Sequence, residues 1–429
     1  MTAGMSRAKK RGGPHAVRRG VLCTLAAVGV WSTGIAGVAP AAVAAEDVQS
    51  KQWYLDAMAA ERMWEVTTGE GIKVAVIDTG VNSSTPSLKG QVLKGLDATE
   101  TEGDETDDYD GHGTTMAELI AGTGKGGGLK GLAPGVKIIP MRISNTEFQN
   151  EHKVNAQDAE EAIRAAADSD AQIISMSFAS EYSSQNERAA VEYAESKGKL
   201  FFAGVGNNAA KDNKEQYPAA YPQVVGVAAT DRKGTVSEYS QHGDAVDIAA
   251  PGNDIPVWCD ENFQSYCDGR GTSAATAIAA ASAALVWSIH PDWTANQVLR
   301  VLFDTAGRDW DKGTLSNYLG HGLVRPGRNI LYGKGDPGAA DINPLTNEKT
   351  PAPSGSPAPA SSASASAEAE AEAGTGEKAG DESDDKPVAA GASEDSEGGS
   401  RLGLIAGVAA VVVVGAGAAF ALLRRRRAA

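Results

Sequence analysis

Basic residues are in short supply in this chain. Its 429 residues include 39 Lys and Arg against 55 Asp and Glu, which gives a net charge of −16 at pH 7. Six of the basic residues and no acid lie within residues 1–45, so removing this segment would take the net charge from −16 to −22. Nucleic-acid binding depends on a cationic surface that neutralises phosphate, so we expect no nucleic-acid partner.

Cysteine is scarcer still, with three residues in the chain. The spacing of Cys259 and Cys267 matches no zinc-binding pattern, which argues against a cysteine-ligated zinc site. Cys23 lies in a segment that we expect to be removed on export. The other two would then pair in an oxidising compartment and close a short loop, the alternative being two free thiols.

The first 45 residues have the pattern of a secretory signal peptide. A basic stretch precedes an apolar run over residues 21–38, and small residues follow at 42–45. This order predicts cleavage near Ala44 or Ala45, with a retained membrane anchor as the alternative. The arginine pair at 18–19 would suit twin-arginine export, but paired basic residues are common in such regions and do not decide the route.

The chain changes character after about residue 333. We expect residues 333–400 to form a disordered linker, because residues 351–400 hold eleven acids, two lysines and no aromatic residue. Residues 402–423 are uncharged and long enough to span a bilayer as a helix. The basic tail at 424–429 would stay in the cytoplasm, which places the rest of the chain outside the cell.

Between these ends, strand-like and helix-like segments alternate. Apolar runs predict strands at 72–77, 136–143, 173–178, 200–205, 224–228 and 246–249. Helical patterns lie at 112–122, 155–168 with Asn155 as N-cap, 185–197, 273–290 and 294–304. In the last of these, Thr294 and Gln297 are placed to form a capping box. The alternation predicts an α/β fold with a mostly parallel central sheet and helices on both of its faces.

Three of these elements carry chemically active side chains. Asp78 ends a buried strand, His112 opens a helix within Asp-Gly-His-Gly-Thr, and Ser273 precedes the most apolar helix within Gly-Thr-Ser-Ala-Ala. A serine hydroxyl is a poor nucleophile until a base removes its proton and a third group orients that base. The order Asp, His, Ser along the chain is the order of the subtilisin triad.

These three motifs resemble those of the subtilisin-like serine peptidases, or subtilases, and the resemblance covers about residues 53–332. It implies a subtilisin-like three-layer catalytic domain at 72–332 that cleaves polypeptides without a cofactor. Ser273 would attack the peptide carbonyl, His112 would move the proton, and Asp78 would orient His112. Many subtilases have a folded pro-domain before this point, for which residues 46–71 are too few, so we expect an N-terminal arm that packs on the core.

The resemblance assigns further roles around the triad. The asparagine of a Gly-Asn step holds the oxyanion in subtilases, and this role falls on Asn207, with Gly206 before it. Ser177, Phe178 and Ala179 correspond to the edge that pairs with an extended substrate. Subtilases usually have glycine where Ala179 stands. The depth of the substrate pocket in this chain therefore cannot be taken from the resemblance.

An acidic run over residues 96–110 precedes the histidine motif. Such a run is usually a solvated loop. The alternatives are a calcium site and a surface that attracts basic substrates. No calcium-loop spacing is present, so we predict no metal ligands and keep structural calcium as an alternative.

The signal, the short arm, the acidic linker and the terminal anchor together resemble the mycosins, subtilases associated with type VII secretion in actinobacteria. This resemblance predicts a single-pass membrane protein with an extracellular catalytic domain that processes type VII substrates and contacts that machinery. Two alternatives remain open. One is a general cell-surface protease, and the other is an inactive subtilase scaffold, against which the complete triad and Asn207 argue.

Overall fold

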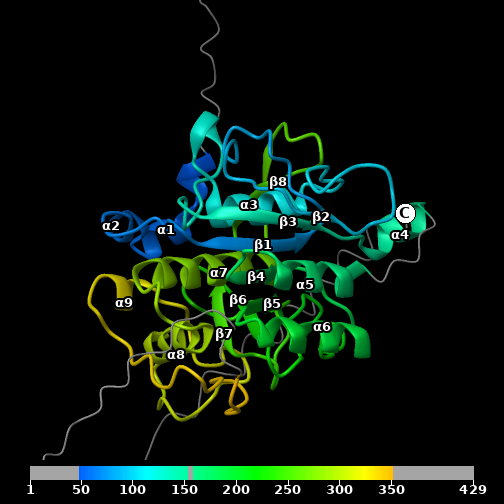
Figure 1. Cartoon of the computed structure of the whole chain (residues 1–429). Coiled ribbons are helices and arrows are strands. Elements are labelled where there is room, and N and C mark those ends of the chain that lie inside the picture. The colour runs from blue at the N-terminus through cyan, green and yellow to red at the C-terminus, as the bar shows by residue number, and fades with distance from the viewer. Residues whose placement is uncertain (1–47, 153–157, 351–429) are drawn as a thin grey trace, which may run out of the picture. The chain divides into compact units, whose positions relative to one another are not determined.

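Seven parallel strands form the central sheet in a computed structural model that describes residues 48–152 and 158–350. They pair in the order β2-β3-β1-β4-β5-β6-β7, so β1 lies inside the sheet (Figure 1). The strands are β1 (Lys73–Asp78), β2 (Leu96–Asp97), β3 (Lys137–Arg142), β4 (Ile173–Met176), β5 (Leu200–Gly204), β6 (Val225–Thr230) and β7 (Ile248–Pro251). All residues of β4 to β7 are buried, as expected for a parallel sheet covered on both faces. The predicted α/β fold is confirmed.

Helices cover both faces of this sheet. They are α1 (Trp53–Ala57), α2 (Ala60–Trp64), α3 (His112–Ala121), α4 (Thr146–His152), α5 (Asp158–Asp168), α6 (Gln185–Ser196), α7 (Thr272–Ile289), α8 (Ala295–Thr305) and α9 (Gly327–Ile330). Successive side chains of a strand point to opposite faces. Accordingly, Val74 and Val76 of β1 enter one core with α3, α7 and α8, whereas Ala75 and Ile77 enter the other with α5 and α6.

Helix α7 runs through the first of these cores and contacts β1, β4, β5, β6 and β7. Its many alanines allow close approach to the sheet, and residues 274–287 are all buried. Within the residues that the structure describes, α7 is the one helix long and apolar enough to cross a membrane, yet 83% of it is buried inside the protein. The predicted span at 402–423 lies outside the described residues, as do the predicted signal peptide, the basic tail and the proposed N-cap Asn155.

The N-terminal arm, of which residues 48–71 are described, packs on the catalytic core. Tyr54 and Met63 are fully buried. The indole N–H of Trp64 donates to the carbonyl oxygen of Leu132 at 2.9 Å, and that of Trp53 donates to the carbonyl oxygen of Asn253 at 3.0 Å. Two buried anchors and two indole hydrogen bonds therefore hold this segment in place.

The predicted start of the disordered linker at residue 333 is wrong. Residues 334–350 are described and pack beside α8, whose predicted capping box between Thr294 and Gln297 is confirmed. The Thr294 hydroxyl also donates to the carbonyl oxygen of Ala340 at 2.8 Å, and the buried side chain of Asn343 donates to Glu195 at 2.7 Å. Polar contacts of this kind leave no apolar periodicity in the sequence. The biased composition itself begins only at 351, outside the described residues.

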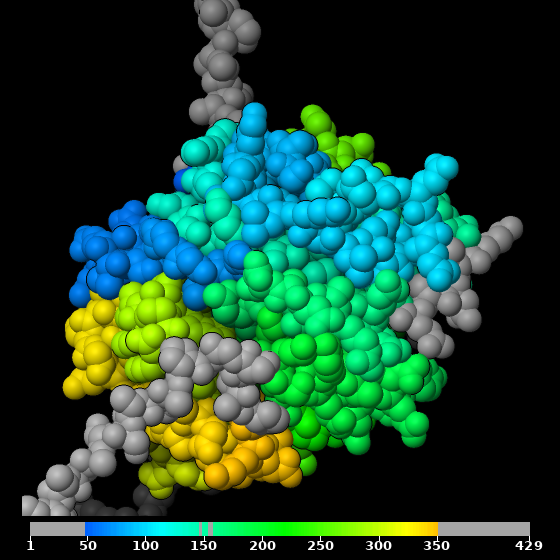
Figure 2. All heavy atoms as spheres, in the orientation of Figure 1, coloured from blue at the N-terminus to red at the C-terminus, as the bar shows by residue number. Residues whose placement is uncertain are grey.

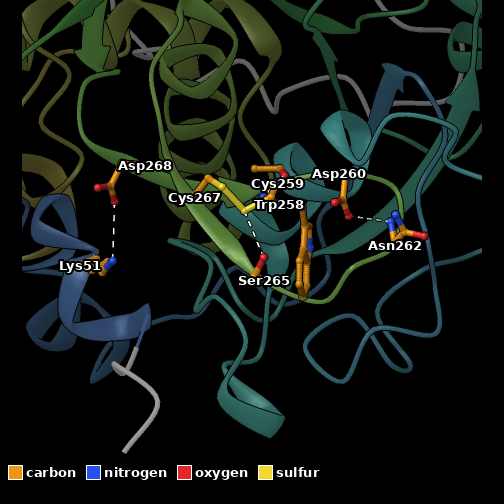
Figure 3. Close-up of a disulfide and its surroundings, with 9 residues drawn as sticks. Lys51, Trp258, Cys259, Asp260, Asn262, Ser265, Cys267 and Asp268 are labelled. Carbon is orange, nitrogen blue, oxygen red and sulfur yellow. Dashed lines mark hydrogen bonds and ion pairs between the residues drawn. A yellow bond between two sulfur atoms is a disulfide. The ribbon is translucent and has the colours of Figure 1, made fainter. Parts of the chain in front are cut away.

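A short antiparallel hairpin, not predicted from the sequence, precedes α7. It consists of β8 (Ile255–Trp258) and β9 (Tyr266–Gly269), and a disulfide joins Cys259 to Cys267 at its end (Figure 3). The ring of Trp258 stacks on that of Tyr266 with centroids 3.8 Å apart. The main-chain N–H of Trp258 donates to the hydroxyl of Thr115 on α3 at 3.0 Å, so the hairpin is tied to the helix that begins with His112.

Removing the disulfide should destabilise the domain by a moderate amount. The bond closes a loop with a sequence separation of 8, and loss of so short a cross-link is expected to cost about 2–3 kcal/mol in the free energy of unfolding. Denaturant unfolding of the Cys259→Ser, Cys267→Ser double variant measures this cost. Reductant should bring the wild type down to the stability of the double variant and leave the variant unchanged. Equal stabilities of the two proteins without reductant would mean that the bond contributes nothing.

Candidate active site

Asp78 and His112 are held together at the carboxyl end of β1. The Nδ1 atom of His112 lies 2.7 Å from Oδ1 of Asp78, whose side chain is almost completely buried. The same carboxylate oxygen accepts the main-chain N–H of Thr79 at 2.8 Å, and the Thr79 hydroxyl lies 3.2 Å from it. Because Nδ1 is engaged by the carboxylate, the Nε2 atom of the ring is left to exchange a proton with a reacting group.

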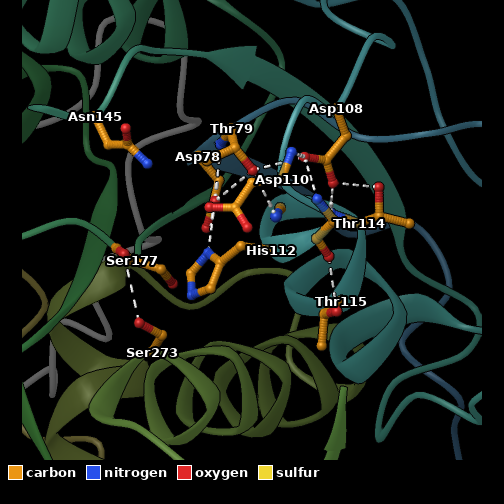
Figure 4. A network of polar contacts seen from close by, with 12 residues as sticks. Asp78, Thr79, Asp108, Asp110, His112, Thr114, Thr115, Asn145, Ser177 and Ser273 are labelled. Atoms are coloured by element: carbon orange, nitrogen blue, oxygen red, sulfur yellow. Dashed lines mark hydrogen bonds and ion pairs between the residues drawn. The ribbon is translucent and has the colours of Figure 1, made fainter. Parts of the chain in front are cut away.

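Ser273 reaches the same place from the first turn of α7. Figure 4 shows the His112 ring between the Asp78 carboxylate and the pair formed by Ser273 and Ser177. The Ser273 hydroxyl donates to the carbonyl oxygen of Ser177 at 3.4 Å, a long hydrogen bond. Catalytic hydrogen bonds often tighten only in the substrate complex, and a hydroxyl rotor turns easily from one acceptor to another. The arrangement places a hydroxyl, an imidazole and a carboxylate in sequence.

Asn207 lies beside the main chain that leads into α7. Its Oδ1 accepts the main-chain N–H of Thr272 at 2.9 Å and the Thr272 hydroxyl at 3.1 Å. These two contacts fix the orientation of the amide and leave the Nδ2 donor for a group near Ser273. The preceding Gly206 has φ +104°, and a Cβ atom there would meet the Gln241 side chain at 1.8 Å, so only glycine fits the turn that delivers Asn207.

Acyl transfer requires a hydroxyl nucleophile, a base, a carboxylate that orients the base and a hydrogen-bond donor for the oxyanion. This site contains all four groups. The sequence model of the subtilase family matches residues 69–322, which include all these groups. The chain belongs to the subtilase family. It is 31% identical over 278 residues to thermitase of Thermoactinomyces vulgaris, an alignment that covers 63% of this chain and 95% of thermitase.

Solved structures place this subtilase more narrowly. The crystal structure of MycP1 from Mycobacterium smegmatis is 26% identical with a TM-score of 0.59, covering 70% of this chain and 89% of MycP1. MycP3 protease from the type VII (ESX-3) secretion system is 29% identical with a TM-score of 0.55, covering 67% of this chain and 89% of MycP3. The chain is therefore a serine endopeptidase of the mycosin-like subgroup.

Asp108 is a functional residue that sequence reasoning missed. The prediction of a solvated acidic loop suits its exposed neighbours, such as Asp104 and Asp107, but is wrong for Asp108, which is 7% exposed. Its carboxylate accepts the N–H groups of Gly111 at 2.9 Å and Thr114 at 2.8 Å, which caps the first turn of α3. The sequence does contain a signal for this role, because Asp108 lies four residues before His112, where the predicted helix begins.

The same carboxylate also connects α3 to β1. Asp108 accepts the hydroxyl of Thr79 at 2.7 Å, and that hydroxyl in turn accepts the N–H of Gly113 at 2.9 Å. A second acid of the run, Asp97, forms an ion pair of 2.9 Å with the buried guanidinium of Arg142. The acidic segment therefore helps hold together the elements that carry Asp78 and His112. Across residues 48–152 and 158–350, no three His, Cys, Asp or Glu side chains gather as a metal site, and the absence of metal remains a prediction.

The residues expected to line the substrate site continue from β4. Phe178 is half-buried and packs on the second core, while Ala179 is exposed. Beyond them, Ser180 and Tyr217 exchange two main-chain hydrogen bonds of 2.9 and 2.8 Å, which anchor the far end of the segment. The carbonyl of Ser177 already accepts the Ser273 hydroxyl. Pairing of residues 177–179 with a substrate stays a prediction, as does a substrate contact of the buried Gly206.

Carboxylates around His112 control its charge. Burial lowers the pKa of the imidazole, but the charge and hydrogen bond of Asp78 act in the opposite direction, and Asp110 and Asp108 add to them. The net effect raises the pKa of His112 to about 9. In the free subtilase the ring is therefore protonated at neutral pH, whereas a general base must be neutral.

The rate of hydrolysis should accordingly rise with pH well beyond the range of an ordinary imidazole. Because kcat/KM reports the titration of the free enzyme, we expect its rising limb to follow the pKa of His112, near pH 9. Asp110→Asn removes one negative charge that favours the imidazolium, so it should shift this limb to lower pH. A pH series of kcat/KM on a short peptide substrate measures both effects. Asp104→Asn, on the same loop, serves as the control, and identical profiles for Asp110→Asn and wild type would contradict the assignment.

Proposed function

We propose that this subtilase is a membrane-anchored, extracytoplasmic endopeptidase that processes proteins exported by a type VII secretion system. The observation that carries the catalytic part is the 2.7 Å hydrogen bond between His112 and Asp78, with Ser273 on the other side of the ring. The similarity to MycP1, described as an essential component of the type VII (ESX-1) secretion system, supports the narrower role. The anchor rests on the uncharged segment at 402–423 and the arginines after it.

Each residue has one role in the proposed mechanism. The Oγ atom of Ser273 attacks the peptide carbonyl carbon while its proton passes to Nε2 of His112, and Asp78 stabilises the imidazolium that forms. The carbonyl oxygen becomes an oxyanion that accepts a hydrogen bond from Nδ2 of Asn207. His112 then returns the proton to the leaving amine, and the acyl group stays on Ser273. A water molecule, deprotonated by His112, attacks the ester, and the proton returns to Oγ as the peptide acid leaves.

Intact cells test the anchor and its orientation. External protease should cut within the acidic segment at 351–400 and release a domain that still hydrolyses a peptide substrate. Deleting residues 402–429 should have the same effect, because the domain is then secreted into the medium. Protection of the acidic segment from external protease would reverse the proposed orientation.

A comparison of surface proteomes separates the mycosin-like role from a general cell-surface protease. Cells that carry Ser273→Ala should differ from wild type in the length of only a few exported proteins, and the purified enzyme should cleave casein slowly. Rapid digestion of casein would favour the general protease. The inactive scaffold would be favoured if all exported proteins kept their lengths and if a fluorophosphonate probe, which reacts with active serines, failed to label Ser273 of the wild type.

A further inference from the structure

A cavity of about 270 Å³ lies where the N-terminal arm meets the core. Figure 2 shows the arm (blue) seated against the segment around α9 (yellow) on one side of the molecule. No triad residue lines this cavity, so it is separate from the site of peptide hydrolysis. Its apolar walls come from both sides of the junction: Trp53, Met58, Pro251, Leu323, Val324 and Leu331.

Four arginines also line the cavity: Arg62, Arg232, Arg325 and Arg328. All four are exposed to solvent. Arg232 lies 3.5 Å from the carboxylate of Asp254, but both side chains are more than half exposed and the pair is weak. In the part of the chain that the structure describes, no ion pair engages any of the other three arginines. A chain with net charge −16 thus gathers unpaired positive charge at one cavity.

Aromatic rings hold three of these guanidinium groups in place without neutralising them. Arg62 and Arg328 both lie near the ring of Tyr332, at 5.8 and 5.7 Å from ring centroid to guanidinium carbon. Arg232 lies 5.6 Å from the Trp53 ring. Such contacts orient a guanidinium group and leave its positive charge available. The single acid of the lining, Asp231, accepts main-chain N–H groups of its own turn.

The walls and the rim of the cavity indicate which chemistry would fit it. The cavity is smaller than the roughly 300–1,000 Å³ of pockets that enclose a small organic ligand, which suits a single large apolar side chain. The guanidinium groups around it match carboxylates, which they bind with two hydrogen bonds each. Arg, Trp and Tyr are also the residues that dominate binding energy at protein interfaces.

We propose that this cavity docks an acidic peptide segment of a partner protein, with one large apolar side chain inside and flanking carboxylates on the arginines. The occupant is a peptide because acids on both sides of one anchor can reach arginines contributed by three separate segments: the arm, the turn around Arg232 and the α9 segment. The proposal is independent of the peptidase chemistry.

Fluorescence anisotropy of labelled peptides with the full-length chain in detergent tests this proposal. The probe is the peptide EEDFLEED, and the controls are EEDGSEED, which lacks the apolar anchor, and KKKFLKKK, which lacks the acids. We expect EEDFLEED to bind at least about tenfold more tightly than either control, because EEDGSEED lacks the apolar anchor and KKKFLKKK lacks the carboxylates, and the site needs both kinds of contact. Raising salt from about 0.05 to 0.5 M should weaken the binding.

Two variants locate the site, and a third controls for nonspecific charge. Arg62→Glu combined with Arg328→Glu should lower affinity for EEDFLEED at least about tenfold. Ala57→Trp, an exposed change on the cavity lining that keeps every arginine, should block the anchor. Arg188→Glu should change nothing, although Arg188 is also exposed and lies 5.8 Å from a tyrosine ring. Hydrolysis of a short peptide by each variant verifies folding.

Several results would overturn the proposal. Equal binding of EEDFLEED and EEDGSEED, or full binding to Ala57→Trp, would show that the cavity accepts no anchor. A wild-type chain that fails to bind EEDFLEED would also contradict the proposal. A dimer of the chain that Arg62→Glu dissociates would assign the cavity to a second copy.

Discussion

Ser273→Ala should abolish peptide hydrolysis by this subtilase while leaving its fold unchanged. The substitution removes the attacking atom, and loss of the serine costs about 10⁶ in turnover in subtilisin itself, the namesake of the family. Among residues 48–152 and 158–350, its hydroxyl has one hydrogen bond, to Ser177 at 3.4 Å; this bond is long, so its loss should change the free energy of unfolding little. Labelling with a fluorophosphonate probe and hydrolysis of a short peptide measure the effect.

A second serine of the same helix serves as the matched control. Ser288 lies in the last turn of α7, and its hydroxyl donates to the carbonyl oxygen of Leu285 at 2.8 Å. Ser288→Ala should keep the wild-type level of labelling, and His112→Ala should lose it. A Ser273→Ala protein that labels as well as wild type would require a different nucleophile.

Asn207→Asp should lower turnover by at least about 10²–10³ while preserving the local structure. The range is that measured for the oxyanion asparagine of subtilisin, and it reflects a donor that acts mainly in the transition state. In this chain the two ends of the Asn207 amide have separate roles. The oxygen accepts two hydrogen bonds from Thr272, and the nitrogen remains available to donate to the oxyanion. Aspartate keeps the acceptor for Thr272, removes the donor and adds a negative charge beside the oxyanion. Asn207→Ala removes both roles.

The measurement is therefore a comparison of kcat and unfolding for the two variants. Both should lose turnover with little change in KM, but only Asn207→Ala should also lose stability, because it leaves the Thr272 donors unpaired. Asn208→Ala, one residue further on and exposed, controls for the position. Wild-type kcat in Asn207→Asp would remove this residue from the oxyanion site.

The features that sequence reasoning located are those with a short-range signature. A buried apolar run ending in an acid identified β1 and Asp78, and glycine-flanked motifs identified the starts of α3 and α7. The capping box of Thr294 and Gln297 needs only residues three positions apart. In each case the physical cause, whether the period of burial or the satisfaction of a helix end, lies within one element.

The features that it missed depend on contacts between distant segments. Asp108 looks like any other acid of its loop until Thr79, which follows β1, supplies a hydroxyl to it. The hairpin β8–β9 is short and only partly buried, so no alternation marks its strands. Residues 334–350 are held by several polar contacts to α8 and one to Glu195 of α6, and no periodicity in the sequence predicts such contacts.

The position of Ser273 in the chain determines when, during folding, this protease becomes active. Asp78 and His112 are only 34 residues apart, and Asp108 joins their elements through local contacts. The nucleophile instead arrives with α7, after every strand of the parallel sheet has been made, and α7 must pack beneath five of those strands. Long-range contacts of this kind form late. In a nascent chain, His112 is therefore positioned by Asp78 before Ser273 is close enough to be activated. We therefore expect proteolytic competence to appear as one of the last events of folding, which delays self-digestion until most cleavable segments are already folded away.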